Sequence, residues 1–223
     1  PNELDVLADA PDKVTGLNIR FVMSHLASAD EAGSDQNLTQ LAAFTRARKI
    51  LPMGQASLAN SSGIFLGPDY HFEMARPGVA LYGGNPTPGQ PNPMVPTVTL
   101  KGRIAQVRHA TAGDTIGYNA TYRVENKAVI ATVLVGYADG YLRSLSGLAS
   151  GIIDGIMVPL VGRVSMDLIT FDVSAVHESA RQPGQWIELL GPTITVDSLA
   201  ATAGTISYEI LTSLGHRYHR VYS

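Results

Sequence analysis

The chain has 223 residues, of which 45% are hydrophobic and 16% charged, and its formal net charge is −3. This composition is typical of a globular protein. The small negative net charge argues against binding to nucleic acid or to an anionic membrane surface. The absence of cysteine excludes disulfides, thiolate nucleophiles and cysteine-ligated metals, and it fits the reducing cytoplasm, where we expect the protein to act. No apolar run is long enough to span a membrane, and the first residues do not have the pattern of a signal peptide.

Residues 1–84 alternate between helix and strand patterns. The spacing of apolar residues predicts a helix over 3–10, a second from a cap at Ser34 or Asp35 to a stop at Leu51–Pro52, and a short third helix within 60–66. Short apolar runs predict three strands, over 17–23, 55–59 and 79–82. An alternation of strands and helices implies a parallel sheet.

The amino-acid composition changes at residues 85–95, which are rich in proline and which we interpret as a linker between two domains. Residues 96–223 contain short strand patterns separated by turn residues, which predict an antiparallel β domain. The expected strands are 98–107, 128–135, 152–160, 168–173 and 186–190, and two helices follow over 196–203 and 208–214. Thr195 and Ser207 are the expected N-caps of these helices, and Gly215 is the expected stop of the second.

Polar residues follow the predicted strands of the first domain. His25 follows the first strand, Ser61 follows the second, and Arg76 with Gly78 lies around the third. In a βα barrel such positions lie at the face that holds the active site, where a hydroxyl and glycine-flanked N–H groups suit a phosphate. Singly, each has a structural explanation: a surface arginine with a buried stem, a hydrogen-bonded histidine, and a helix-capping serine.

Six motifs, spread along the whole chain in family order, resemble those of bacterial alanine racemases. In the first domain they are Met23–Glu31 (MSHLASADE), Ala56–Ser61 (ASLANS) and Met74–Gly83 (MARPGVALYG). In the second they are Gly136–Tyr141 (GYADGY), Gly162–Asp167 (GRVSMD) and Tyr208–Thr212 (YEILT). The resemblance implies a fold of α/β plus all-β class, in which the last strands of a TIM-type (β/α)8 barrel precede an antiparallel β domain, with the terminal helical segment returning toward the active site.

The resemblance also implies an isomerase that uses pyridoxal 5′-phosphate (PLP), needs no metal, and interconverts L- and D-alanine for cell-wall peptidoglycan. Arg76 matches the arginine that faces the pyridine nitrogen, and His25 matches the histidine beside the ring. The phosphate would be held by Ser61, Gly78, Val79 and Tyr208. Tyr118 matches the catalytic tyrosine, and the substrate entrance and pocket would include Tyr137, Arg143, Met166 and Asp167. The family is a homodimer in which residues of the Tyr118, Tyr137 and Met166 type cross the subunit interface.

The chemistry of these residue types agrees with those roles. An arginine keeps its proton, so it leaves the pyridine nitrogen unprotonated and weakens PLP as an electron sink, which disfavours transamination. Racemisation needs an acid/base group on each side of Cα, and we expect nearby cations to lower the pKa of Tyr118 from about 10 so that it serves as one of them.

The N-terminal part of the family pattern is absent. The four lysines, Lys13, Lys49, Lys101 and Lys127, all lack the context of the Schiff-base lysine of the family. We therefore expect this chain to be the C-terminal portion of such an enzyme, inactive without the missing half. Three alternatives stay open: a barrel-type amino-acid decarboxylase, disfavoured by Arg76; a racemase of broader specificity, for example for serine; and a non-catalytic interaction module.

Overall fold

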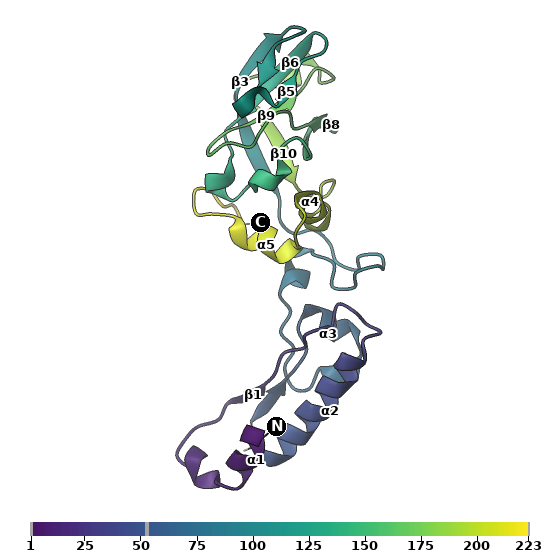
Figure 1. Ribbon diagram of the computed structural model, residues 1–223, viewed down its shortest axis with the longest axis vertical. Helices are drawn as coiled ribbons and strands as arrows, with labels where there is room; N and C mark the ends of the chain where they lie inside the picture. The colour runs from purple at the N-terminus through teal and green to yellow at the C-terminus, as the bar shows by residue number, and fades with distance from the viewer. Residues whose placement is uncertain (1, 52–53, 223) are drawn as a thin grey trace. The chain divides into compact units, whose positions relative to one another are not determined.

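The computed structural model describes residues 2–51 and 54–222, which form two compact units, one ending at Val95 and one beginning at Pro96. Each unit has a hydrophobic core of its own. Figure 1 labels their helices and strands. No helix within the described residues has both the length and the apolar character that a membrane crossing requires.

The first unit is built on a pair of parallel strands. Strands β1 (Phe21–Met23) and β2 (Gln55–Ser57) pair in register, with Val22 opposite Ala56, and helix α2 (Asp35–Ile50) connects them. Figure 1 shows α2 running beside this pair. The unit is completed by α1 (Asn2–Ala8), α3 (Ser61–Phe65) and the 3-10 turns η1 (Pro11–Val14), η2 (Pro68–Tyr70) and η3 (Val79–Tyr82). Phe44 of α2 packs edge-to-face on Phe72, with ring centroids 5.0 Å apart, and so anchors the helix to the core.

The third strand predicted for this unit is wrong. Residues 79–82 form the 3-10 turn η3, which Gly83 ends in the left-handed conformation at φ 85°. A run of four apolar residues has the same pattern in a buried strand and in a helical turn, so periodicity alone cannot separate them. The two remaining strands are also shorter than the predicted 17–23 and 55–59. The predicted stop of α2 is confirmed as far as Leu51, and Pro52 lies outside the described residues.

The second unit is an antiparallel β domain, as predicted. Its six-stranded sheet has the order β8-β7-β10-β3-β6-β9. These strands are β3 (Leu100–Ala110), β6 (Ala128–Val133), β7 (Ser150–Ile153), β8 (Ile156–Pro159), β9 (Ile169–Asp172) and β10 (Trp186–Leu190). A small hairpin, β4 (Thr115–Ile116) with β5 (Tyr122–Arg123), was not predicted. Helices α4 (Val196–Ala203) and α5 (Ser207–Ser213) close the unit, which also has the 3-10 turns η4 (Tyr118–Ala120), η5 (Tyr137–Asp139), η6 (Arg143–Leu145) and η7 (Glu178–Ala180).

Two predictions for the second unit are wrong. The single strand expected over 152–160 is the hairpin β7–β8, whose turn residues Asp154 and Gly155 both have positive φ, 49° and 77°. An Asp-Gly pair is a strong hairpin signal, because the turn type requires positive φ at both positions. Ser207 is not the N-cap of α5, since Ile206 holds that position and the Ser207 hydroxyl donates to Asp197 Oδ1 at 2.5 Å. Thr195 does cap α4, accepting from the N–H of Ser198.

Candidate active site

Arg76 joins the carboxyl ends of β1 and β2. Its Nη1 donates to Ser57 Oγ at 2.6 Å and its Nη2 to the carbonyl of Ser24 at 2.7 Å. Ser57 is fully buried, and its hydroxyl donates a hydrogen bond to the carbonyl of Met74. The guanidinium is therefore not a surface group with a buried stem, but the centre of a polar cluster at the end of the parallel strands.

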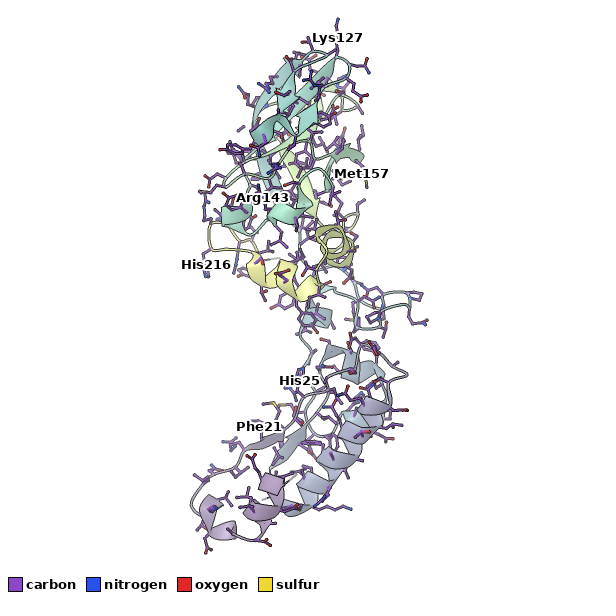
Figure 2. All side chains as sticks on the ribbon, in the orientation of Figure 1. Phe21, His25, Lys127, Arg143, Met157 and His216 are labelled. Carbon is purple, nitrogen blue, oxygen red and sulfur yellow. The ribbon has the colours of Figure 1, made fainter. Side chains whose placement is uncertain are left out.

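His25 lies against this arginine. Its Nδ1 is 3.4 Å from Arg76 Nη2, and its Nε2 is 3.4 Å from Asn60 Nδ2. Its carbonyl accepts from Gln40 of α2, which fixes the backbone that follows β1. Figure 2 labels His25 within the first unit. The imidazole thus lies between an amide and a guanidinium that both present N–H groups to it.

Ser61 is buried at the first position of α3, but it does not cap that helix. Asn60 is the N-cap, accepting from the N–H of Gly63 at 2.9 Å. The hydroxyl of Ser61 instead accepts from the N–H groups of Gly78, at 2.8 Å, and Ala80, at 3.3 Å. It therefore joins α3 to the start of η3, where Val79 is buried.

In the second unit, backbone hydrogen bonds join the loops that carry Tyr137 and Met166. The N–H of Tyr137 donates to the carbonyl of Ser165 at 3.0 Å, and the N–H of Ala138 donates to that of Met166 at 2.9 Å. The side chains of Tyr137 and Met166 are both exposed, Met166 to 55%. The carboxylate of Asp167 does not stand free, because Arg217 pairs with it at 2.8 Å.

Arg143 lines a pocket of about 460 Å³ in the second unit. Arg163 lines it as well, and hydroxyl-bearing side chains and glycines complete the wall: Thr121, Tyr122, Ser146, Gly147 and Gly162. Figure 2 labels Arg143 on its 3-10 turn η6. Two guanidinium groups in one open pocket make it attractive to a carboxylate.

Tyr118 and Tyr208 have exposed side chains in the second unit. Tyr118 opens η4 and is 71% exposed, and Tyr208 lies on α5 and is also exposed. Gly117 precedes Tyr118 with φ 79°, and a Cβ there would be 2.9 Å from the N–H nitrogen of Arg163. That close approach requires glycine and fixes the backbone from which Tyr118 projects.

Comparison with protein families gives two adjacent matches. The profile described as "Alanine racemase, C-terminal domain" matches residues 97–222, and the profile described as "Alanine racemase, N-terminal domain" matches residues 1–86. The first alone covers more than half of the chain. The chain belongs to the alanine racemase family.

Individual alanine racemases agree with this membership. The chain is 53% identical to the alanine racemase of Rhodospirillum rubrum and 50% identical to the catabolic alanine racemase of Mesorhizobium japonicum, each over 222 residues. Those matches take in 100% of this chain but 59% and 58% of the relatives. The alanine racemase of Bartonella henselae, solved with covalently bound pyridoxal phosphate, has a TM-score of 0.90 at 39% identity, covering 100% of this chain and 62% of that one. This chain thus spans about three fifths of the length of these alanine racemases.

Sequence reasoning did not single out Ser57, Asn60 or Arg217. Ser57 and Asn60 lie inside the motif Ala56–Ser61, so a closer examination of that motif could have found them. Asn60 before Ser-Ser-Gly is also a typical helix-capping pattern. Arg217 gives no signal in the sequence, because its two carboxylate partners are 78 and 50 positions away (217 − 139 and 217 − 167).

Proposed function

We propose that this chain supplies part of the active site of a PLP-dependent alanine racemase that acts in the cytoplasm and provides D-alanine for peptidoglycan. The observation that carries the proposal is the cluster of Arg76, His25 and Ser57 at the carboxyl ends of the two parallel strands. A donor-only guanidinium held at that place, beside an imidazole, is the group that family membership leads us to expect at the PLP ring.

The residues present fit the cofactor. The hydroxyl of Ser61 accepts from the N–H groups of Gly78 and Ala80, which hold it in place, and it can donate its own hydrogen to a phosphate. A Cβ added at Gly78 would be 3.8 Å from Ser61 Oγ, so a side chain at this position would fill the space beside the hydroxyl. When bound, PLP withdraws electrons from Cα of the amino acid and makes its hydrogen acidic. Tyr208 joins the phosphate site in this proposal, and Val79 contributes its backbone.

Arg76 tunes that electron withdrawal. Ser57 and the carbonyl of Ser24 hold the guanidinium in place through two short hydrogen bonds. Because a guanidinium does not give up its proton at physiological pH, it donates to the ring nitrogen and leaves that nitrogen unprotonated. By this contact Arg76 would favour return of the proton to Cα over transamination. His25, next to Arg76, would restrict the position of the ring.

Tyr118 moves the proton on one side of Cα. It projects from a backbone that Gly117 fixes, and its exposure suits a residue that enters the site of a second subunit. The acid/base group on the other side would be the PLP-binding lysine of the family. Among the described residues, no hydrogen bond or ion pair of the Arg76 cluster involves a lysine.

The remaining candidates admit and orient alanine. Arg143 places a positive charge in the pocket of the second unit, where it attracts the carboxylate of an amino acid. Tyr137 and Met166 limit the room for the substrate side chain to about that of a methyl group, and Asp167 fixes the end of their loop through Arg217. We propose that a homodimer brings these residues to the PLP site of the partner.

The proposal is tested by reconstitution. The part of the Rhodospirillum rubrum alanine racemase that this chain does not match is fused ahead of residue 1, and the product, here called the reconstituted protein, is purified with PLP. We expect it to bind PLP and to convert L-alanine to D-alanine, measured by chiral chromatography. A correctly folded protein that retains PLP yet forms no D-alanine would contradict the proposal and favour a non-catalytic module.

A pair of serine variants separates the phosphate site from general folding. Ser61→Ala in the reconstituted protein removes the hydroxyl that would donate to the phosphate, and we expect it to weaken PLP binding about tenfold. Ser62→Ala, one position further along α3, is the matched control and should bind PLP normally. PLP titration followed by absorbance measures both. Equal affinities for the two variants would remove Ser61 from the proposed phosphate site.

A further inference from the structure

Three segments of the second unit meet around the turn η5. The first is the loop Gly136–Gly140 and the second is the loop Ser165–Leu168. The third is the stretch Ser213–Arg217 that follows α5, and Figure 2 labels its member His216. The contact is close: a Cβ at Gly136 would be 2.3 Å from the carbonyl oxygen of Met166, and one at Gly140 would be 1.8 Å from that of Ser213.

Arg217 bridges the first two segments through their carboxylates. Its Nε is 3.2 Å from Asp139 Oδ1, and its Nη1 is 2.8 Å from Asp167 Oδ1. Both ion pairs lie within the second unit. The hydrogen bond to Asp167, followed by the charge of Asp139, raises the pKa of Arg217, so the guanidinium keeps its charge throughout the physiological range.

The bridge matters because the Asp139 carboxylate is nearly buried. The side chain of Asp139 is only 10% exposed, and its Oδ2 accepts from the N–H of Gly136 at 2.9 Å. A buried carboxylate without a cationic partner is costly, whereas an exposed pair such as Arg217–Asp167 contributes little by itself. The guanidinium therefore has two effects: it compensates the charge of Asp139, and it ties that buried group to the neighbouring loop.

We infer that Arg217 is a positioning residue that fixes the loop of Tyr137 against the loop of Met166. Among the described residues, its hydrogen bond and ion pairs go to Asp139 and Asp167, not to the side chain of Tyr137 or Met166. Its guanidinium holds the carboxylates of Asp139 and Asp167. The two loops are then kept in register by two backbone hydrogen bonds, from the N–H of Tyr137 to the carbonyl of Ser165 and from the N–H of Ala138 to the carbonyl of Met166. The consequence for catalysis rests on the proposed function, which places Tyr137 and Met166 at the substrate. A lysine is a single point charge and cannot hold both carboxylates in this way.

The first arm of the test is independent of activity and uses the 223-residue chain. Hydrogen–deuterium exchange is followed by mass spectrometry on peptides covering 135–142, which carry the amides of Tyr137 and Ala138, and 128–133 of β6. Arg217→Gln should speed exchange of the first peptide about fivefold and leave β6 unchanged. The matched control is Arg220→Gln, because Arg220 lies on the same terminal stretch but contacts only the carbonyls of Leu214 and Gly215. It should change neither peptide.

The second arm measures alanine kinetics in the reconstituted protein. Arg217→Gln should raise KM about fivefold with kcat within about twofold, and Arg217→Lys should restore KM only in part. In the exchange arm, adding Asp167→Asn to Arg217→Gln should speed exchange of peptide 135–142 little further, because both changes break the same bridge. Unchanged exchange and KM, a uniform rise in exchange that includes β6, or full rescue by lysine would each overturn the inference. Absence of turnover in the unaltered reconstituted protein would instead count against the proposed function, and the exchange arm would still decide the role of Arg217.

Discussion

Arg76 shows at the scale of one residue how buried hydrogen bonds change the meaning of a side chain. From the sequence it fits a snorkelling arginine, whereas in the structure it joins Ser24 and Ser57 at the ends of two strands. Its two tasks, holding the strand ends and facing the proposed cofactor, cannot be separated by removing it alone. A useful variant must therefore keep a polar group at this position while reversing its effect on the pyridine nitrogen.

Arg76→Glu is such a variant. A carboxylate would hold the ring nitrogen protonated and strengthen electron withdrawal, so we expect racemisation by the reconstituted protein to fall about 100-fold and transamination of alanine to rise. Pyruvate formation and D-alanine formation are measured on the same samples, and the PLP content of each sample is determined as the control for folding. If both rates stayed unchanged at full PLP occupancy, Arg76 would have no role at the ring.

Tyr141 has a buried hydroxyl with no hydrogen-bond partner within the described residues. Burial, with a smaller effect of Tyr218, raises its pKa above the usual value, so the folded protein keeps this proton after the unfolded chain has lost it near pH 10. The stability from this group is complete below pH 10 and is lost as the pH rises. We expect the free energy of unfolding to fall by about 1.4 kcal/mol per pH unit above pH 10.5 on its account.

Tyr141→Phe should remove the part of this fall with pH that Tyr141 causes. It should leave the free energy of unfolding at pH 7 unchanged or slightly higher, since no hydrogen bond is lost. Urea unfolding at pH 7 and pH 11.5 measures both effects. Tyr222→Phe is the control, because Tyr222 is 87% exposed and should leave the slope as it is. A marked loss of stability at pH 7 in Tyr141→Phe would mean that the hydroxyl has a partner.

At the scale of elements, sequence patterns succeeded where one signal dominated. Helix α4 and strand β10 have the predicted bounds, because a capping threonine precedes the helix and turn residues flank the strand. The sequence-based predictions were wrong at residues 79–82, where a short apolar run fits either a strand or a helical turn. They were also wrong at Asp154–Gly155, where a turn signal inside an apolar run was overlooked. The contact between η5 and the end of α5 joins positions far apart in the chain, so local patterns could not predict it.

That contact can be tested with two glycines of similar conformation. Gly140 and Gly147 both have positive φ, 93° and 69°, but a Cβ would be 1.8 Å from the carbonyl oxygen of Ser213 at Gly140 and would meet nothing within 4 Å at Gly147. We expect Gly147→Ala to cost about 1 kcal/mol of unfolding free energy and Gly140→Ala at least about 3 kcal/mol, because only the latter must displace backbone. Urea denaturation of both variants measures the difference. Equal costs would show that α5 does not pack on η5 as described.

At the scale of the whole molecule, the candidate residues are divided between two units. His25, Ser61, Arg76, Gly78 and Val79 lie in the first, and the tyrosines Tyr118, Tyr137 and Tyr208 lie in the second. Motif resemblance supplied nearly all of them before the structure was known, because all but Tyr118 lie within one of the six family motifs. What it could not supply is how each is held, since Arg76, Ser61 and Asp167 bond to partners that lie in other, distant segments of the chain.

The central claim is that Tyr118 of this chain performs proton transfer on one side of Cα. The most direct measurement follows exchange of the Cα hydrogen in D2O, starting separately from L- and from D-alanine, with the reconstituted protein and PLP. We predict exchange of both enantiomers by the unaltered protein and by Tyr222→Phe, whereas Tyr118→Phe should lose exchange of one enantiomer by at least about 100-fold and retain that of the other. Undiminished exchange of both enantiomers by Tyr118→Phe would contradict the account.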